Sequence, residues 1–193
     1  MPWKCRPVVW FPSWLLRLTT TVSPAAVALR ARDQQGPPIG FQLLSQPELD
    51  DRQETWSARN FTDTPFMTRD KVAASWRHYL GSAAASPYAA PARAMDVSGL
   101  PPAYIATAEF DPNRDEAIGY AQRLLQAGVS VELHQWPGTF HGSQAILSAG
   151  VSRLQIAELG AALRRALAPP RTRRTAVTAR RLRRSSRSSW DWW

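Results

Sequence analysis

An alternation of helical and extended patterns between residues 24 and 168 constrains the fold of this chain most. Helical spacing of apolar residues covers 25–33, 68–80, 113–126 and 151–168. Short apolar or alternating stretches, typical of strands, cover 39–44, 102–110 and 129–136. Such alternation predicts an α/β fold with a mostly parallel sheet and helices on both faces.

Turn and capping residues mark where these elements stop. Thr68 stands at a helix N-cap position, and Gly81 and Gly128 follow the ends of two helices. Residues 45–67 form a polar stretch that we expect to be a loop, and residues 137–142 read as a turn. With these boundaries, the second strand ends directly before Asp111 and the third strand ends shortly before His141.

Composition divides the chain into three segments. Residues 24–170 hold 13 basic and 14 acidic residues, whereas residues 171–193 hold eight arginines and one acid. The net charge of +9 therefore belongs to the ends and does not indicate a specific nucleic-acid-binding domain. We predict an irregular segment at 1–23, a globular domain at 24–168 and a disordered arginine-rich tail at 169–193.

The first segment fits neither a helix nor a strand. Lys4 and Arg6 before an apolar stretch at 8–16 resemble a secretory signal, but Pro12 interrupts that stretch. We therefore favour a cytoplasmic protein. Six of the nine tryptophans lie in the two terminal segments, and this abrupt shift suggests translation in a wrong frame.

Several classes of protein are excluded by simple counts. The single cysteine, Cys5, excludes an internal disulfide framework and a cysteine-rich zinc site. Three scattered histidines indicate no metal cluster, so we expect no metal and no cofactor. No apolar run approaches the ~20 residues of a membrane-spanning helix. The oligomeric state stays open.

Two titratable residues follow neighbouring strands and could meet at one edge of the sheet. Asp111 comes directly after the strand at 102–110, and His141 comes shortly after the strand at 129–136. A carboxylate and an imidazole in contact form the orienting acid and the general base of a nucleophilic triad. Each residue also has a simpler interpretation, because Asp111 could cap the next helix and His141 could be an ordinary loop histidine.

The surroundings of both residues resemble the α/β-hydrolase fold, and within it the hormone-sensitive-lipase-like carboxylesterases. DPNRDEA resembles that group's DPxRDEG segment, and the HG at 141–142 resembles its histidine motif. QPELD resembles a YP-x-LD-type turn, with Pro47, Leu49 and Asp50 matching. The resemblance covers about residues 24–168, implies a partial fold that lacks the N-terminal half, and implies triad roles for Asp111 and His141. Asp115 would brace the acid loop or serve the first turn of its helix.

The nucleophile that such a triad needs is not found in this sequence. No serine has glycine at both −2 and +2, as a G-x-S-x-G elbow requires, and HG occurs only at 141–142. Cys5 and Ser45 lack the strand-to-helix context of a nucleophile, and Ser143, directly after the HG motif, lies on the wrong side of the sheet order. We therefore predict a small-molecule carboxylic-ester hydrolase by resemblance, with a serine acyl-enzyme mechanism, truncated and inactive as written. The alternative is a non-catalytic remnant whose arginine-rich tail binds polyanions.

Overall fold

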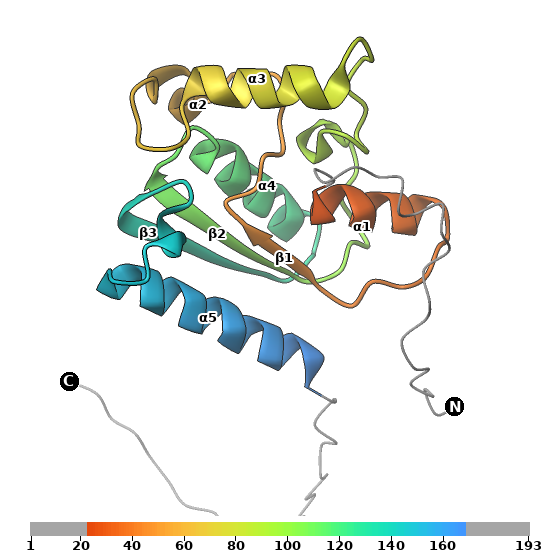
Figure 1. The fold of residues 1–193 in the computed structure, drawn as a ribbon. Helices are drawn as coiled ribbons and strands as arrows, with labels where there is room; N and C mark the ends of the chain where they lie inside the picture. Colours follow the sequence, from red (N-terminus) through yellow and green to blue (C-terminus); the bar gives the residue numbers. More distant parts are fainter. Residues whose placement is uncertain (1–22, 169–193) are drawn as a thin grey trace, which may run out of the picture.

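The structure, a computed structural model, describes residues 23–168. The predicted segments 1–23 and 169–193 therefore lie outside the described residues, apart from Ser23. The chain order is α1, β1, α2, α3, β2, α4, β3 and α5, with two short 3-10 helices called η2 and η3 (Figure 1). Their bounds are Pro24–Asp33, Gln42–Ser45, Trp56–Asn60, Arg69–Leu80, Ala103–Phe110, Arg114–Gln126, Val131–Phe140 and Gly150–Leu167, with η2 at Pro91–Arg93 and η3 at Ser143–Ala145.

The three strands form one parallel sheet in the order β1-β2-β3, as the alternation of patterns predicts. Leu44 pairs with Ile105 on β2, and Ile105 pairs in turn with Leu133 on β3. Because all strands run the same way, their carboxyl ends lie at one edge. In the described part of the chain, β1 has a strand neighbour on one side only.

One face of the sheet is tightly packed. Helices α1 and α4 lie on this face in Figure 1, with α2 and α3 beyond α4. Their side chains join the sheet in a core of fully buried residues that includes Leu29, Leu44, Ile105, Tyr120 and Leu124. Burial of side chains of this size supplies about 1.5–3 kcal/mol each, which holds α4 in a fixed position on β2 and β3.

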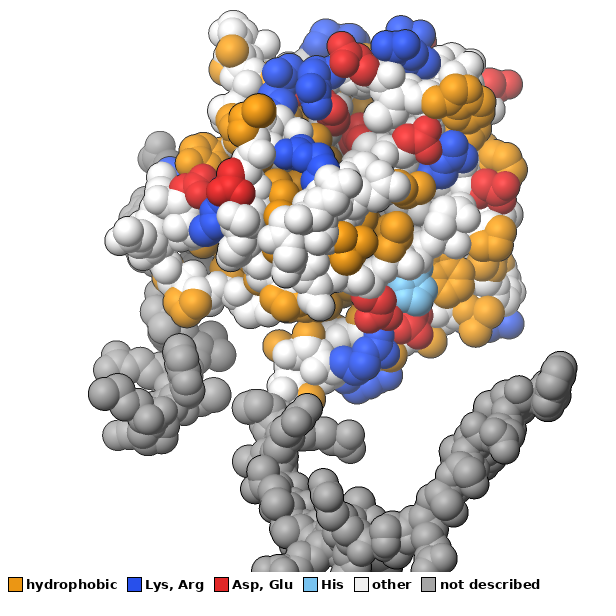
Figure 2. All heavy atoms as spheres, turned by 180° about the vertical axis from the view of Figure 1, so that it is seen from behind, with side chains coloured by type: hydrophobic (Ala, Val, Ile, Leu, Met, Phe, Trp, Pro, Cys, Tyr) orange, Lys and Arg blue, Asp and Glu red, His pale blue; other side chains and the backbone are white. Residues whose placement is uncertain are grey.

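Of the described elements, α5 is the helix that covers the other face, and this face is loosely packed. Its buried cluster contains only Tyr104, Ala106 and Ala162. The sequence pattern gives α5 a wide apolar stripe, but Leu154 is 62% exposed and Leu167 is 74% exposed. Apolar side chains also reach the surface among acidic and basic groups on the side of the molecule that Figure 2 shows. The apolar stripe of α5 is therefore mostly uncovered within residues 23–168.

The structure corrects three sequence expectations. The stretch at 45–67 is not all loop, because α2 forms at Trp56–Asn60, where the Thr55 hydroxyl accepts a hydrogen bond from the Ala58 N–H. Residues 137–140 continue β3 instead of forming a turn, because Phe140 still pairs with Phe110 after a register shift. The first strand is shorter than residues 39–44 and begins three residues later.

No helix among residues 23–168 is long and apolar enough to cross a membrane. The longest described helix, α5, carries Arg153, Arg164 and Arg165 along its length.

Candidate active site

Asp111 lies immediately beyond the carboxyl end of β2 and is almost completely buried, at 1% exposure. One of its carboxylate oxygens, Oδ1, accepts a hydrogen bond from the backbone N–H of Asn113 at 2.9 Å. Asn113 is the residue that precedes α4, so the carboxylate also organises the start of this helix. The capping interpretation and the catalytic interpretation thus concern different oxygens of one side chain.

The other oxygen of Asp111 meets His141, which follows the last residue of β3. The distance from His141 Nδ1 to Asp111 Oδ2 is 2.8 Å. An ionised carboxylate can only accept hydrogen bonds, so a neutral His141 carries its proton on Nδ1 and leaves Nε2 as an acceptor. The structure brings the two predicted residues together in the geometry of an acid–base pair.

The charges around His141 favour its protonated form. Burial alone would lower the pKa of His141, but the hydrogen bond and the charge of Asp111 raise it, and the charge of Glu48 adds to the effect. The net result is a pKa above the ordinary value of 6.5. A base whose cationic form is stabilised by a buried carboxylate suits transient proton uptake.

Glu48 is a site residue that the sequence reasoning missed. Burial raises its pKa above the ordinary value, although a hydrogen bond with Ser75 and the charge of His141 oppose that rise. Glu48 lies in the turn after β1, where the resemblance to a YP-x-LD-type turn leaves the residue type open. The sequence signal for Glu48 was therefore weak: an acidic residue directly after Pro47, which matches the turn motif.

Glu116 is a second buried acid that the sequence reasoning missed. It is 4% exposed on α4, and its Oε1 accepts hydrogen bonds from the N–H groups of Leu49 at 2.6 Å and Asp50 at 3.3 Å. Burial raises the pKa of Glu116 well above its ordinary value, and the two backbone donors only partly oppose this. Glu116 thus joins the helix of the acid to the turn after β1.

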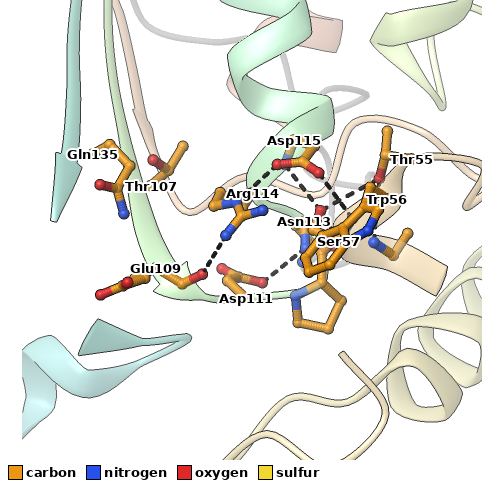
Figure 3. Close-up of polar contacts among 12 residues, drawn as sticks. Thr55, Trp56, Ser57, Thr107, Glu109, Asp111, Asn113, Arg114, Asp115 and Gln135 are labelled. Carbon is orange, nitrogen blue, oxygen red and sulfur yellow. Dashed lines mark hydrogen bonds and ion pairs between the residues drawn. The ribbon is translucent and has the colours of Figure 1, made fainter. Parts of the chain in front are cut away.

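The loop of the acid is braced by contacts with α2, as Figure 3 shows. Asp115 accepts a hydrogen bond from the Ser57 N–H at 2.8 Å, and the Ser57 hydroxyl bonds the carbonyl of Pro112. The Arg114 guanidinium donates to the Glu109 carbonyl at 3.0 Å. Burial alone would raise the pKa of Asp115, but hydrogen bonds from Arg114 and Ser57 lower it. Asp115 therefore holds the segment that carries Asp111, as one of its two predicted roles requires.

Neither Ser45 nor Ser143 forms a hydrogen bond with the ring of His141 in the described part of the chain. Ser45 ends β1 with an exposed side chain, and Ser143 is buried in η3, where its carbonyl accepts a hydrogen bond from Ser152. Cys5 lies outside the described residues. Within residues 23–168, the ring of His141 makes its hydrogen bond with Asp111 alone.

Two cavities lie in the described part of the chain, and neither is lined by Asp111 or His141. A cavity of about 290 Å³ between the sheet and α5 is lined by residues that include Ser45, Gln46, Tyr104 and Gln155. The other, of about 320 Å³, lies beside Trp76 and Arg77 on α3. The first cavity is linked to the acid–base pair through Gln46, which lines it and accepts a hydrogen bond from the Gly142 N–H next to His141.

One group in the described part of the chain brings three possible metal ligands together, namely Glu132, His134 and Glu158. The Arg165 guanidinium already bonds both carboxylates, at 2.7 Å to Glu132 and 2.9 Å to Glu158. Arg165 therefore offsets part of the negative charge of this cluster, to which neither Asp111 nor His141 belongs.

Comparison with known proteins agrees with the fold described above. Residues 24–145 match a family model described as the alpha/beta hydrolase fold. This match covers more than half of the chain, and the chain therefore belongs to the α/β-hydrolase fold family.

The relatives are esterases. The chain is 44% identical over 121 residues to esterase LipI of Mycobacterium tuberculosis, covering 61% of this chain and 38% of that protein. Carboxylesterase NlhH of the same species is 42% identical over 124 residues, covering 61% and 39%. These relatives confirm the resemblance to hormone-sensitive-lipase-like carboxylesterases.

Solved structures give the same result. A bacterial heroin esterase superposes with a TM-score of 0.74 and 53% identity, covering 75% of this chain and 48% of that chain. Esterase LipW from Mycobacterium marinum has a TM-score of 0.71 and 44% identity, covering 75% and 46%. The chain spans less than half the length of these relatives, so the activity of a whole esterase is a matter for proposal.

Proposed function

We propose that this chain carries the acid and the base of a serine-type carboxylic-ester hydrolase. The observation that supports this most directly is the 2.8 Å contact between His141 Nδ1 and the buried Asp111 Oδ2. The esterase relatives support the reaction class. The substrate would be a small-molecule carboxylic ester.

In this mechanism, His141 Nε2 removes the proton of a serine hydroxyl while the serine oxygen attacks the ester carbonyl. Asp111 keeps the Nδ1–H directed inward and stabilises the imidazolium that forms. The imidazolium then gives its proton to the departing alcohol, which leaves an acyl-serine. A water molecule loses its proton to His141 and attacks the acyl group, and the proton returns to the serine when the acid departs.

We further propose that the chain as written does not turn over esters. Its sequence holds no G-x-S-x-G elbow to supply the attacking hydroxyl. The acid–base pair alone cannot form the acyl-enzyme.

We also propose a cytoplasmic location, because Pro12 interrupts the apolar stretch that a secretory signal would need.

A chimera tests the proposal. The N-terminal half of a similar esterase, including its nucleophile, is fused before residue 24, and hydrolysis of p-nitrophenyl acetate is measured. We expect turnover in the chimera and none in the chain alone. Asp111→Asn and His141→Gln in the chimera should each reduce kcat by about 10³-fold or more. A folded chimera that is active without His141 would refute the assignment.

The arginine-rich tail favours a second candidate, binding of polyanions. Eight arginines in residues 171–193 would bind a phosphate backbone through a term that weakens steeply with salt. Binding of the whole chain to heparin or duplex DNA is measured from about 50 to about 300 mM salt, a range over which screening of exposed charges increases strongly. Retention that is independent of salt, or of the tail arginines, would exclude this candidate.

A further inference from the structure

A partly buried hydrogen bond joins the loop that carries His141 to the end of β1. The backbone N–H of Gly142 donates to the side-chain Oε1 of Gln46 at 2.7 Å. Gln46 directly follows β1 and is 8% exposed. Since this N–H belongs to the peptide bond between His141 and Gly142, its partner sets the orientation of the backbone next to the imidazole.

Gln46 adopts a backbone conformation that costs free energy. Its φ angle is +50°, in the left-handed region that residues with a Cβ rarely occupy. A glycine would adopt this turn without that cost. Residues held in this region tend to be over-determined by their surroundings and are enriched at functional sites. Here the Gln46 N–H donates to the Ala106 carbonyl at 2.8 Å, so the residue is fixed to β2 as well.

Other contacts on the same loop are weaker or lie elsewhere. The ring of Phe66 stacks on His141 with centroids 6.3 Å apart, but Phe66 is 67% exposed. A Cβ at Gly142, whose φ is +80°, would lie 3.2 Å from the Phe66 ring. The Ser152 hydroxyl holds the Ser143 carbonyl, one residue further along. Gln46 is thus the buried polar side chain that bonds the backbone at the base itself.

The turn that begins at Gln46 is also tied to the acid. Three and four residues later, the N–H groups of Leu49 and Asp50 donate to Glu116 on α4, the helix that starts after Asp111. Residues 46–50 therefore contact the base through Gln46 and the helix of the acid through Glu116. A short, buried turn of this kind sets the distance between two loops that come from different strands.

We propose that Gln46 is a positioning residue for His141. Its carboxamide oxygen holds the peptide group between His141 and Gly142, and so holds the imidazole at hydrogen-bonding distance from Asp111. The catalytic value of this contact rests on the proposed function. The resemblance to a YP-x-LD-type turn places a tyrosine at this position, so the carboxamide is a feature of this chain.

The test uses NMR signals that do not depend on catalysis. The His-Gly dipeptide occurs once, at 141–142, so the full chain labelled with ¹³C-carbonyl histidine and ¹⁵N-glycine gives one selective amide signal. Ring labelling with ¹⁵N-histidine reports separately on the Nδ1 proton that faces Asp111. Chemical unfolding of each variant supplies the global stability, against which exchange of the Gly142 amide is corrected.

Gln46→Gly removes the carboxamide but relieves the left-handed backbone. We expect the Gly142 amide to shift upfield and to exchange at least about fivefold faster, and the His141 Nδ1 proton signal to broaden. Gln46→Glu keeps an acceptor oxygen at the same reach and should restore the Gly142 signal. Gln35→Gly is the matched control, because Gln35 is an exposed glutamine with a φ of +51°.

Two results would overturn the proposal. One is a Gly142 amide that is unchanged in Gln46→Gly. The other is a changed amide with unchanged ring signals, which would make Gln46 a support of the loop alone. The proposed function fails separately: an inactive chimera with both signals still responding to Gln46→Gly would refute ester hydrolysis and keep the positioning role.

Discussion

The two faces of the sheet differ in how well this chain fills them. Among residues 23–168, the face under α1 and α4 carries a core of 15 buried apolar residues, whereas the apolar cluster under α5 has three buried members. Both Asp111 and the buried Glu116 belong to the well-packed side, through the loop and helix that follow β2. The difference shows that the acid half of the site rests on a completed core, although the α5 face does not have one.

The base stands between these two regions. His141 contacts Asp111 on one side, and on the other it leads into η3, whose Ser143 carbonyl bonds Ser152 on α5. Buried polar side chains gather on the α5 side, and Gln155 is 5% exposed with no hydrogen-bond partner among the described residues. Such groups destabilise a face that cannot satisfy them. We therefore expect substitutions on the two faces to have unequal effects.

The largest expected difference concerns core leucines. Leu124→Ala removes a fully buried side chain from α4 and should lower the free energy of unfolding by about 3 kcal/mol. Leu159→Ala removes a half-buried side chain from α5 and should cost about 1 kcal/mol. Urea unfolding followed by circular dichroism measures both. Equal costs would show that α5 is packed as firmly as α4, and the comparison would fail.

How far the sequence could predict this arrangement depends on the range of the interactions. Asp111 and His141 could be placed together because strand order alone brings their loops to one edge. The roles of Gln46 and Glu116 could not be predicted, because they depend on contacts between residues 66 to 96 positions apart. The role of Glu48 depends on its distance from His141, 93 positions further along the chain. The burial of α5 was not predictable from its stripe, since what covers a helix is a tertiary property.

Glu116 gives the second prediction, on the well-packed side. Glu116→Ala leaves the N–H groups of Leu49 and Asp50 without their acceptor and should cost about 2 kcal/mol. Glu116→Gln keeps the acceptor and is the matched control. Its cost at neutral pH should be much smaller, as urea unfolding at pH 7 would show. A Gln variant as unstable as the Ala variant would contradict an acceptor role.

The pH dependence of stability separates Glu116 further. Its pKa is raised in the folded state above the ordinary 4.5, so the folded state binds more protons in this range. The stabilising contribution is full below pH 4.5 and is lost as the pH rises toward the raised value. Glu116→Gln should remove this slope. A slope that persists in the variant would assign it to another group.

His141 supplies a smaller effect in a higher window. Its pKa is raised above 6.5 in the folded state, so its contribution is present below pH 6.5 and is lost as the pH rises through the folded value. His141→Gln should reduce the slope of the free energy of unfolding with pH above pH 6.5, whereas His78→Gln, at an exposed position on α3, serves as the control.

Asp111→Asn should lower the pKa of His141, because the effect of burial is then opposed less strongly. A ¹⁵N-histidine titration measures this shift. An unchanged pKa of His141 in Asp111→Asn would show that the charge of Asp111 does not act on the imidazole.

The smallest expected change in stability is on the open face of α5. Leu154 is 62% exposed there, and Leu154→Lys should change the free energy of unfolding by less than about 0.5 kcal/mol. Exposed apolar patches promote association, so the same variant should reduce concentration-dependent self-association, measured by sedimentation velocity. Ala157→Lys adds the same charge on α5 without removing a large apolar group. If both lysines act equally, charge repulsion explains the effect. If only Leu154→Lys acts, the uncovered apolar stripe is what distinguishes this face from the core under α4.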